Sequence, residues 1–287
     1  MTILAADQIP KTPYAIIGGS STLSLSFPED LERDDTEVLA SQLVFQTPYG
    51  PSPIFKYVQL DNKTFLTCKM HGWRPNEVKR GVASQQLFWV LQQAGVKKIY
   101  AEGGVGSVNH LLELRDLVIP HDYIDRSLRT DIDLGGSYLL VMRQPVCPTG
   151  VEALYHAAKE AVAGSDRHVF KRGVYMNTDG RHFESVAEVD AFRRDLVDMV
   201  GQSMCPEVYL AREIGACYAR IDMVVNFAEG IRKEWEHKDL SDIFYKEAKT
   251  IANILLNALK ETHDDQEACG CHLLRKKTLL KDEYREQ

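Results

Sequence analysis

The 287-residue chain has no long hydrophobic run, no repeat and no excess of basic side chains. No stretch approaches the about 18 uninterrupted apolar residues that can cross a bilayer, so we expect no membrane-spanning segment. The formal net charge of −7 argues against nucleic acid or an anionic membrane as the main partner, because both need a basic footprint. The N-terminus lacks the basic and then apolar pattern of a signal peptide, and we therefore expect a cytoplasmic protein.

Cysteine is scarce and scattered. Three of the six cysteines lie in or beside apolar runs and are interpreted as small core residues: Cys68, Cys205 and Cys217. Cys147 precedes a proline where a helix is expected to start. Only Cys269 and Cys271, separated by Gly270, have a recognisable spacing. Two thiols one residue apart can form a strained, easily reduced disulfide or provide half of a metal site. Its one adjacent candidate ligand is His272, so the sequence predicts neither a metal nor an organic cofactor.

Strand patterns alternate with helix patterns along most of the chain. Strands are predicted at 14–19, 54–60, 64–70, 98–101, 117–119, 123–124, 168–176, 197–200 and 217–225. Helices are predicted at 82–94, 151–163, 186–196, 206–214 and 240–259. This alternation predicts a single α/β domain over residues 1–287, with a mixed, mainly parallel central sheet flanked by helices and a tail from residue 261.

Small polar residues follow most of the predicted strands. They occupy 18–21, 71–72, 103–107, 180–185, 202–203 and 226–227. Glycine and serine end strands in many proteins, so any one of these segments is explained as ordinary loop chemistry. In parallel sheets, however, ligands bind beyond the carboxyl ends of the strands, and six such ends together favour one shared pocket.

One group of these residues suits an oxyanion. The Gly-Gly-Ser turn at 18–20 can present backbone N–H groups and a hydroxyl to a single phosphate. Ser203 offers a second hydroxyl before the predicted helix at 206–214, whose N-terminal dipole favours an anion. His71 can donate a further hydrogen bond. No cluster of carboxylates suggests Mg²⁺, so we expect a site without a metal.

A second group suits a heterocycle. Phe183 offers a face for stacking, Glu184 a carboxylate that can accept N1–H of a 6-oxopurine, and Asn226 an amide that can bond both O6 and N7. Each has an alternative structural explanation: Phe183 as a core residue, Glu184 as an acid in the first turn of a helix, and Asn226 as a turn residue.

Eight motifs occur in an order that resembles a known family. They are IIGGSS from residue 16, MHG at 70–72, GGVGS at 103–107, YIDR at 123–126, PVCP at 145–148, DGRHFES at 179–185, GQSMCPEVYLAREIGACYARI at 201–221 and VNFAEGI at 225–231. Over about residues 13–260 the chain resembles the trimeric purine nucleoside phosphorylases and the methylthioadenosine or methylthioinosine phosphorylases. The CGC at 269–271 resembles a C-x-C of the methylthioadenosine phosphorylases.

The resemblance implies an activity and an assembly. Enzymes of this family split the N-glycosidic bond of purine nucleosides with inorganic phosphate as co-substrate, giving free base and ribose 1-phosphate. They use no cofactor and are trimers or hexamers. The implied partners of this chain are therefore a purine nucleoside, phosphate and further copies of itself.

The resemblance also implies roles for individual residues. Positions in contact with phosphate are Ser20, Met70, His71, Gly104 and Ser203. Positions in contact with the nucleoside are Phe183, Glu184, Gln202, Asn226 and Ala228. The catalytic positions are Asn226 and His71. Asn226 and Ala228 stand where adenine-type members have acids, a pattern that resembles 6-oxopurine enzymes, with 5′-methylthio nucleosides as further candidate substrates.

The chain departs from the family at the phosphate site. Met70 stands where the family has its main phosphate-binding arginine, and Gln202 where it has a methionine beside the ribose. A replacement cation could come from Arg74, Lys79, Arg80 or Arg181. Two further interpretations follow from this departure: a hydrolase in which water replaces phosphate, or a nucleoside-binding protein that does not catalyse.

Overall fold

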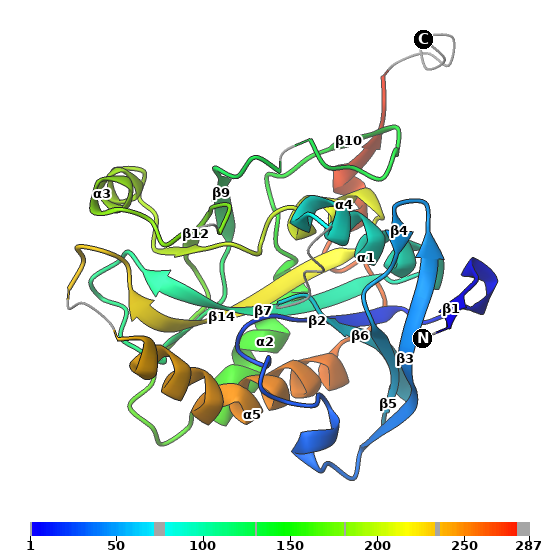
Figure 1. Ribbon diagram of the computed structural model, residues 1–287, viewed down its shortest axis with the longest axis horizontal. Coiled ribbons are helices and arrows are strands. Elements are labelled where there is room, and N and C mark those ends of the chain that lie inside the picture. Colours follow the sequence, from blue (N-terminus) through cyan, green and yellow to red (C-terminus); the bar gives the residue numbers. More distant parts are fainter. Residues whose placement is uncertain (1, 72–77, 130, 181, 233–235, 280–287) are drawn as a thin grey trace.

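A mixed sheet of thirteen strands runs through the centre of the computed structural model (Figure 1). The structure describes residues 2–71, 78–129, 131–180, 182–232 and 236–279, without the side chain of residue 237. The strands of this sheet are β1 (Ile3–Leu4), β2 (Tyr14–Gly18), β3 (Thr36–Thr47), β4 (Gly50–Pro51), β5 (Phe55–Leu60), β6 (Lys63–Lys69), β7 (Lys98–Ser107), β8 (Leu117–Val118), β9 (Asp122–Asp125), β11 (Val169–Phe170), β12 (Val174–Asn177), β13 (Met199–Gly201) and β14 (Cys217–Phe227).

Helices flank both faces of the sheet. They are α1 (Arg80–Ala94), α2 (Pro148–Ala161), α3 (Val186–Arg194), α4 (Glu207–Glu213) and α5 (His237–Glu261), with short 3₁₀ turns η1 (Ala6–Gln8), η2 (Glu29–Leu31) and η3 (Cys271–Leu274). Figure 1 shows α2 and α5 on one face and α1 and α4 on the other. A separate two-stranded ladder joins β10 (Tyr138–Leu140) to β15 (Arg275–Lys277). The predicted α/β architecture with a mixed, mainly parallel sheet is thus confirmed.

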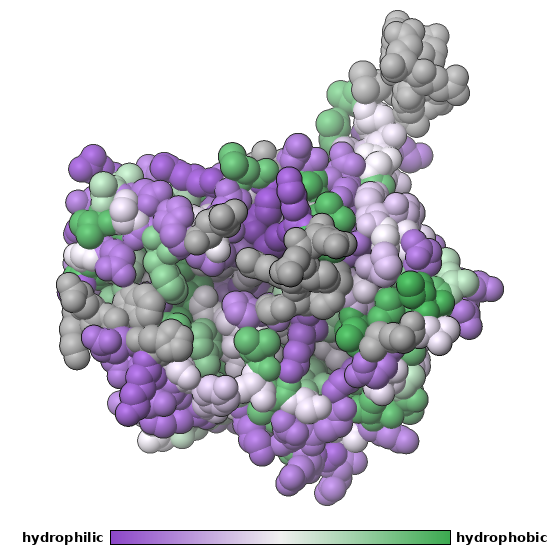
Figure 2. Space-filling view, viewed as in Figure 1, coloured by the Kyte–Doolittle hydropathy of each residue, from purple (hydrophilic) through white to green (hydrophobic). Residues whose placement is uncertain are grey.

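The long helix α5 shows why these segments fold as they do. Its inner side chains, Ile251, Leu255 and Leu259 among them, are fully buried against the sheet at helical spacing. Figure 2 shows hydrophilic side chains over α5 and η2 on the outer face of the molecule. In the described part of the chain, none of the helices has both the length and the apolar character needed to cross a membrane.

Three details of the sheet differ from the sequence-based expectation. The strand expected at 168–176 is two strands, β11 and β12, which pair with different neighbours. The glycine turn expected at 103–107 lies inside β7, which continues to Ser107. The twelve-residue β3 was not predicted, because two register shifts against β5 and a positive φ at Gln42 interrupt the alternation of its side chains.

The centre of β7 is where two other strands meet end to end. One edge of β7 pairs with β14 along its whole length. The other edge pairs in parallel with β2 as far as Ala101, and in antiparallel with β13 from Gly106. Because β2 and β13 run toward each other, their carboxyl ends both reach the middle of β7. The turns that follow them, at 19–22 and 202–205, are thereby brought together.

Candidate active site

A cavity of about 270 Å³ opens at the point where β2 and β13 meet. Its lining residues are Ser20, His71, Gly104, Gly106, Phe183, Glu184, Val200, Gly201, Gln202, Val225, Asn226, Ala228, Glu229, Leu240 and Phe244. All five predicted nucleoside-binding positions are among them. The interpretation that the strand ends share one pocket is therefore supported by the geometry.

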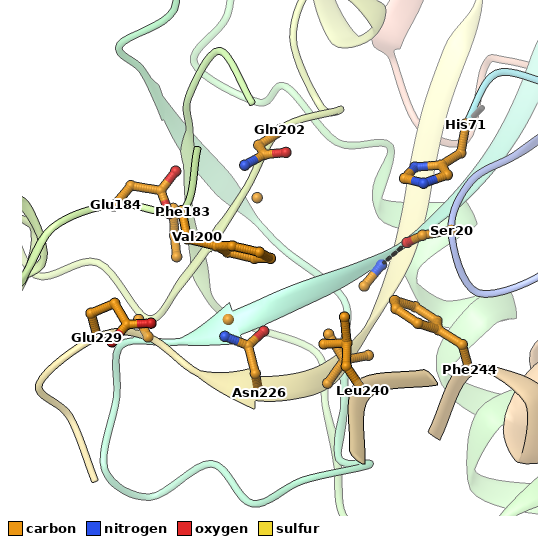
Figure 3. Close-up of a pocket in the computed structure, with 15 residues that line it drawn as sticks. Ser20, His71, Phe183, Glu184, Val200, Gln202, Asn226, Glu229, Leu240 and Phe244 are labelled. Atoms are coloured by element: carbon orange, nitrogen blue, oxygen red, sulfur yellow. Dashed lines mark hydrogen bonds between the residues drawn. The ribbon is translucent and has the colours of Figure 1, made fainter. Parts of the chain in front are cut away.

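The two ends of this cavity differ in chemistry. Figure 3 shows Phe183, Glu184, Asn226 and Glu229 at one end and Ser20 with His71 at the other. Gln202 lies between the two groups. The first end combines an aromatic ring with carboxylates and an amide, which suits a flat polar heterocycle.

Glu184 and Asn226 are buried and held in place. Glu184 is 6% exposed, and its Oε1 accepts a hydrogen bond of 2.5 Å from the Thr178 hydroxyl. Asn226 is 4% exposed, and its Nδ2 donates at 3.0 Å to the carbonyl of Phe227, the last residue of β14. Buried polar side chains discriminate strongly between ligands, because a ligand that leaves them unpaired loses their hydrogen bonds.

A smaller cavity of about 70 Å³ adjoins the second end. It shares Ser20, His71, Gly104 and Gln202 with the larger cavity. Its other lining residues are Ile17, Gly18, Gly19, Met70, Arg80, Glu102, Ser203 and Glu207. All five predicted phosphate-contact positions therefore surround one small polar space. Met70 is buried there and contributes no charge.

The Gly-Gly-Ser turn does not present its amides as the sequence suggested. The N–H groups of Gly19, Ser21 and Thr22, and the Thr22 hydroxyl, all donate to the carboxylate of Glu102 on β7. The Gly19 N–H of the predicted turn is therefore already bonded to a buried internal carboxylate, whereas the other two donor amides lie beyond the turn. Burial raises the pKa of Glu102 and the four hydrogen bonds oppose this rise. The hydroxyl of Ser20 remains directed at the cavity wall, where it accepts the Gly104 N–H at 2.8 Å.

A buried ion pair supports Ser203. Arg220 on β14 is fully buried, its Nε donates to Asp222 Oδ2 at 2.8 Å, and its Nη2 donates to Ser203 Oγ at 3.1 Å. Burial opposes the charge of the Arg220 guanidinium, but Asp222 and neighbouring tyrosines outweigh it and raise its pKa well above the ordinary value. A permanent cation thus lies directly behind the Ser203 hydroxyl.

Arg80 is the second arginine at this end. It is the first residue of α1, and its Nη2 lies 3.8 Å from Glu207 Oε1. Glu207 also accepts a hydrogen bond of 2.9 Å from the Tyr218 hydroxyl. Burial raises the pKa of Glu207, whereas Arg80 and Arg220 lower it. Of the four cations considered from the sequence, Arg80 lines the small cavity and Lys79 lines neither; Arg74 and Arg181 lie outside the described residues.

The helix that follows Ser203 is shorter than expected. α4 begins at Glu207, one residue after Pro206, and has only seven residues. The first side chain of this helix is the buried acid Glu207. The charge of Arg220, in hydrogen-bond contact with the Ser203 hydroxyl, is thus present in addition to the helix N-terminus that the sequence predicts after this residue.

Several lining residues were not found from the sequence. Leu240 and Phe244 come from the first turns of α5 and close the cavity below Gly104. A Cβ on Gly104 would lie 2.6 Å from the Phe244 ring, so glycine is required at this close approach. Glu229, which follows Ala228 in the sequence, also lines the cavity and is not predicted from the sequence. Nothing in the periodicity of α5 indicates that its N-terminal end reaches the site.

A heterocycle site joined to a small oxyanion site, on a mixed α/β sheet, is the arrangement of a nucleoside phosphorylase. Residues 13–260 match the family model described as the phosphorylase superfamily, and the chain belongs to this family.

Individual relatives agree with this assignment. The chain is 31% identical over 268 residues to a 6-oxopurine nucleoside phosphorylase of Pyrococcus furiosus, covering 90% of this chain and 95% of the relative. It is 28% identical to a probable S-methyl-5′-thioinosine phosphorylase of Methanothermobacter thermautotrophicus, covering 91% and 88%. A solved methylthioadenosine phosphorylase from an antarctic soil metagenomic library superimposes with a TM-score of 0.81 at 23% identity, covering 96% of this chain and 94% of that one. This last likeness shows the fold.

Proposed function

We propose that this protein cleaves 6-oxopurine nucleosides with inorganic phosphate, giving the free base and ribose 1-phosphate. The observation that carries the proposal is the pair of joined cavities, one lined by Phe183, Glu184 and Asn226 and the other by Ser20 and Ser203. Family membership and the names of the relatives support the same reaction.

In this proposal each end of the site has its own task. Phosphate in the small cavity would lie below C1′, and one of its oxygens forms the new bond to C1′ as the C1′–N9 bond breaks. The electron pair of that bond passes to the purine, which takes a proton at N7 from solvent water. Asn226 bonds N7–H and O6 of the leaving base, and Glu184 accepts N1–H. These bonds strengthen as charge develops on the purine, which is what accelerates the reaction.

The cation missing at Met70 is supplied by Arg80 in this proposal. Arg80 lines the small cavity from α1, and its pairing with Glu207 leaves it beside the position of the phosphate. Arginine binds phosphate through charge-assisted hydrogen bonds, which are among the strongest available. Arg220 adds positive charge through Ser203.

The test is base release from inosine with and without added phosphate. We expect release to require phosphate, and Met70→Arg to lower the phosphate concentration needed. If release proceeds equally without phosphate, water is the nucleophile and the hydrolase replaces this proposal. If purine nucleosides bind but no base is released under either condition, the protein is a binding protein.

The apolar side chains of α5 favour an apolar group on the ribose. Leu240 and Phe244 both line the larger cavity. We therefore propose that 5′-methylthioinosine is accepted at least as well as inosine. A comparison of kcat/KM for the two nucleosides tests this, and a strong preference for inosine would contradict it.

We also propose that the protein assembles as a homotrimer or a dimer of trimers. Large apolar side chains are exposed around the base end of the cavity: Leu128 is 88% exposed and Phe183 is 51% exposed. Exposed apolar groups of this size commonly mark an interface.

A further inference from the structure

Four buried cysteines come together at the amino end of β14. Cys147 precedes the first residue of α2, Cys217 is the first residue of β14, and Cys269 and Cys271 flank Gly270 beyond α5. Their sulfur atoms all lie within 4.8 Å of one another. The four side chains form a cluster of their own in the core of the described chain. No spacing in the sequence connects Cys147 and Cys217 with the C-terminal pair, so the sequence does not predict this cluster.

The cluster is remote from the proposed active site. Cys217 and Asn226 stand at opposite ends of the same strand. Nine residues of extended strand separate them by about 30 Å. The phosphorolysis proposed above makes no use of these thiols, so the cluster needs an explanation of its own.

The distances suit a tetrahedral metal centre. Zinc binds thiolate sulfur at about 2.3 Å, so the four sulfurs of a tetrahedral site lie about 3.8 Å apart. The sulfurs of Cys217 and Cys269 are 3.4 Å apart, slightly less than this ideal distance. All four sulfurs lie within 4.8 Å of one another, an upper limit slightly greater than the ideal distance. Gly270 has a φ of +64°, a backbone conformation that turns its two flanking cysteines toward the same point.

Two hydrogen-bond donors face sulfur atoms of the cluster. Lys98 is only 5% exposed, and its Nζ lies 4.0 Å from Cys269 Sγ. Gln266 directs Nε2 at Cys217 Sγ from 3.4 Å. A buried ammonium is costly unless a negative charge compensates it. Neither four neutral thiols nor two disulfides supply that charge, whereas a zinc ion with four thiolates carries a net charge of −2.

We propose that Cys147, Cys217, Cys269 and Cys271 hold a structural zinc ion. On binding, four thiols release four protons and form four zinc–sulfur bonds, which fill the coordination shell and leave no position for a substrate. The ion ties the segment that carries η3 and β15 to the first residue of β14 and to the start of α2. This proposal departs from the sequence-based prediction that no metal is bound.

The test begins with the metal content of the full chain purified under reducing conditions without chelator. We expect about one zinc per chain, and the same content in Cys68→Ser, which removes a buried cysteine outside the cluster. Cys217→Ser and Cys271→Ser should each lose most of the zinc. Removal of zinc from the unmodified protein should lower its Tm, and adding zinc back should restore it.

Cobalt substitution separates a built site from adventitious metal and does not depend on the folding of any variant. The unmodified chain loaded with Co²⁺ should show the intense visible and charge-transfer bands of a tetrahedral tetrathiolate centre. Weak bands typical of oxygen and nitrogen ligands would overturn the proposal. So would a mass lower by four hydrogens, showing two disulfides, or four reactive thiols without metal after incubation with zinc. None of these results bears on phosphate dependence, so the two proposals stand or fall separately.

Discussion

Single residues at the base end of the cavity carry the proposed choice of substrate. Glu184 and Asn226 are nearly inaccessible to solvent, and each is already oriented by a hydrogen bond to a neighbour. Groups fixed in this way cannot adapt to a base with the opposite arrangement of donors and acceptors. In the proposed function their identity decides between 6-oxopurines and 6-aminopurines.

Glu184→Ala should remove most of the preference for inosine over adenosine. Losing a hydrogen bond to a buried group costs about 1–3 kcal/mol, or roughly ten- to a hundredfold in the ratio of kcat/KM values. Glu184→Gln is the matched variant, because its amide keeps the shape and can donate to the unprotonated N1 of adenine. We expect it to shift the ratio further toward adenosine. An unchanged ratio in both variants would refute the assignment of Glu184.

Arg80→Ala should raise the KM for phosphate by about ten- to a hundredfold, the range expected for one charged hydrogen bond. The KM for the nucleoside should change much less. Arg80→Lys should recover part of the loss, since it keeps the charge beside Glu207. Lys79→Ala, one residue earlier and outside both cavities, serves as the control. Equal increases in the KM for phosphate and the KM for the nucleoside would contradict a specific contact between Arg80 and phosphate, and would indicate a general loss of structure.

Among the elements, α5 connects the site with the opposite edge of the molecule. Its first turns supply Leu240 and Phe244 to the cavity. Farther along, Asn253 and Asn257 each accept a hydrogen bond of 2.9 Å from Arg33, which precedes β3. Arg33 also binds Asp35, and Lys260 near the end of α5 binds the same carboxylate at 2.8 Å.

This network gives the stability of the protein a dependence on acid pH. The hydrogen bonds from Arg33 and Lys260 lower the pKa of Asp35, although partial burial opposes them. Because the folded pKa lies below the unfolded one, the contribution is complete above about pH 4 and is lost as the pH falls through the folded value. Asp35→Asn should cost about 1 kcal/mol at pH 7, a figure that allows for solvent screening, and the difference should shrink below pH 4.

Urea unfolding at a series of pH values measures this difference. Asp34→Asn is the control, because that neighbouring side chain is exposed and takes no part in the network. A difference between Asp35→Asn and the unmodified protein that stays constant down to pH 2 would contradict the linkage.

The elements also show how far the sequence could be interpreted. Periodicity predicted all five α-helices of the described residues and most of the strands, because each of these elements buries at least one face in the core. It missed β3, where register shifts break the alternation, and it could not find the partners of Glu102 or the approach of Cys147 to Cys271. These depend on segments far apart in the chain, and local spacing contains no information on them. The motifs located the cavity, whereas proposing Arg80 rather than Lys79 as the phosphate-binding cation required the position of α1.

At the scale of the whole molecule, the exposed Leu128 bears on assembly. Its N–H donates to Asp179, so it belongs to the loops around the base end of the cavity. Leu128→Asp should weaken self-association, because a carboxylate that must be desolvated in an apolar interface is costly. Sedimentation velocity at micromolar protein measures the change. Leu39→Asp alters an exposed leucine on β3, at the other end of the sheet, and is the control. A monomer for the unmodified chain would remove the proposed trimer.

The meeting of β2 and β13 on β7 leaves one amide in an unusual position. Along this edge of β7, pairing with β2 ends at Ala101 and pairing with β13 begins at Gly106. The Gly104 N–H lies between these two points and donates to the Ser20 hydroxyl instead of to a strand. A side-chain hydroxyl can rotate away without unfolding a strand, so this proton should exchange with deuterium far sooner than those paired with β14. Phosphate bound to Ser20 would immobilise the hydroxyl and slow the exchange. The isotope content of a single glycine amide would then report how much of the site is filled.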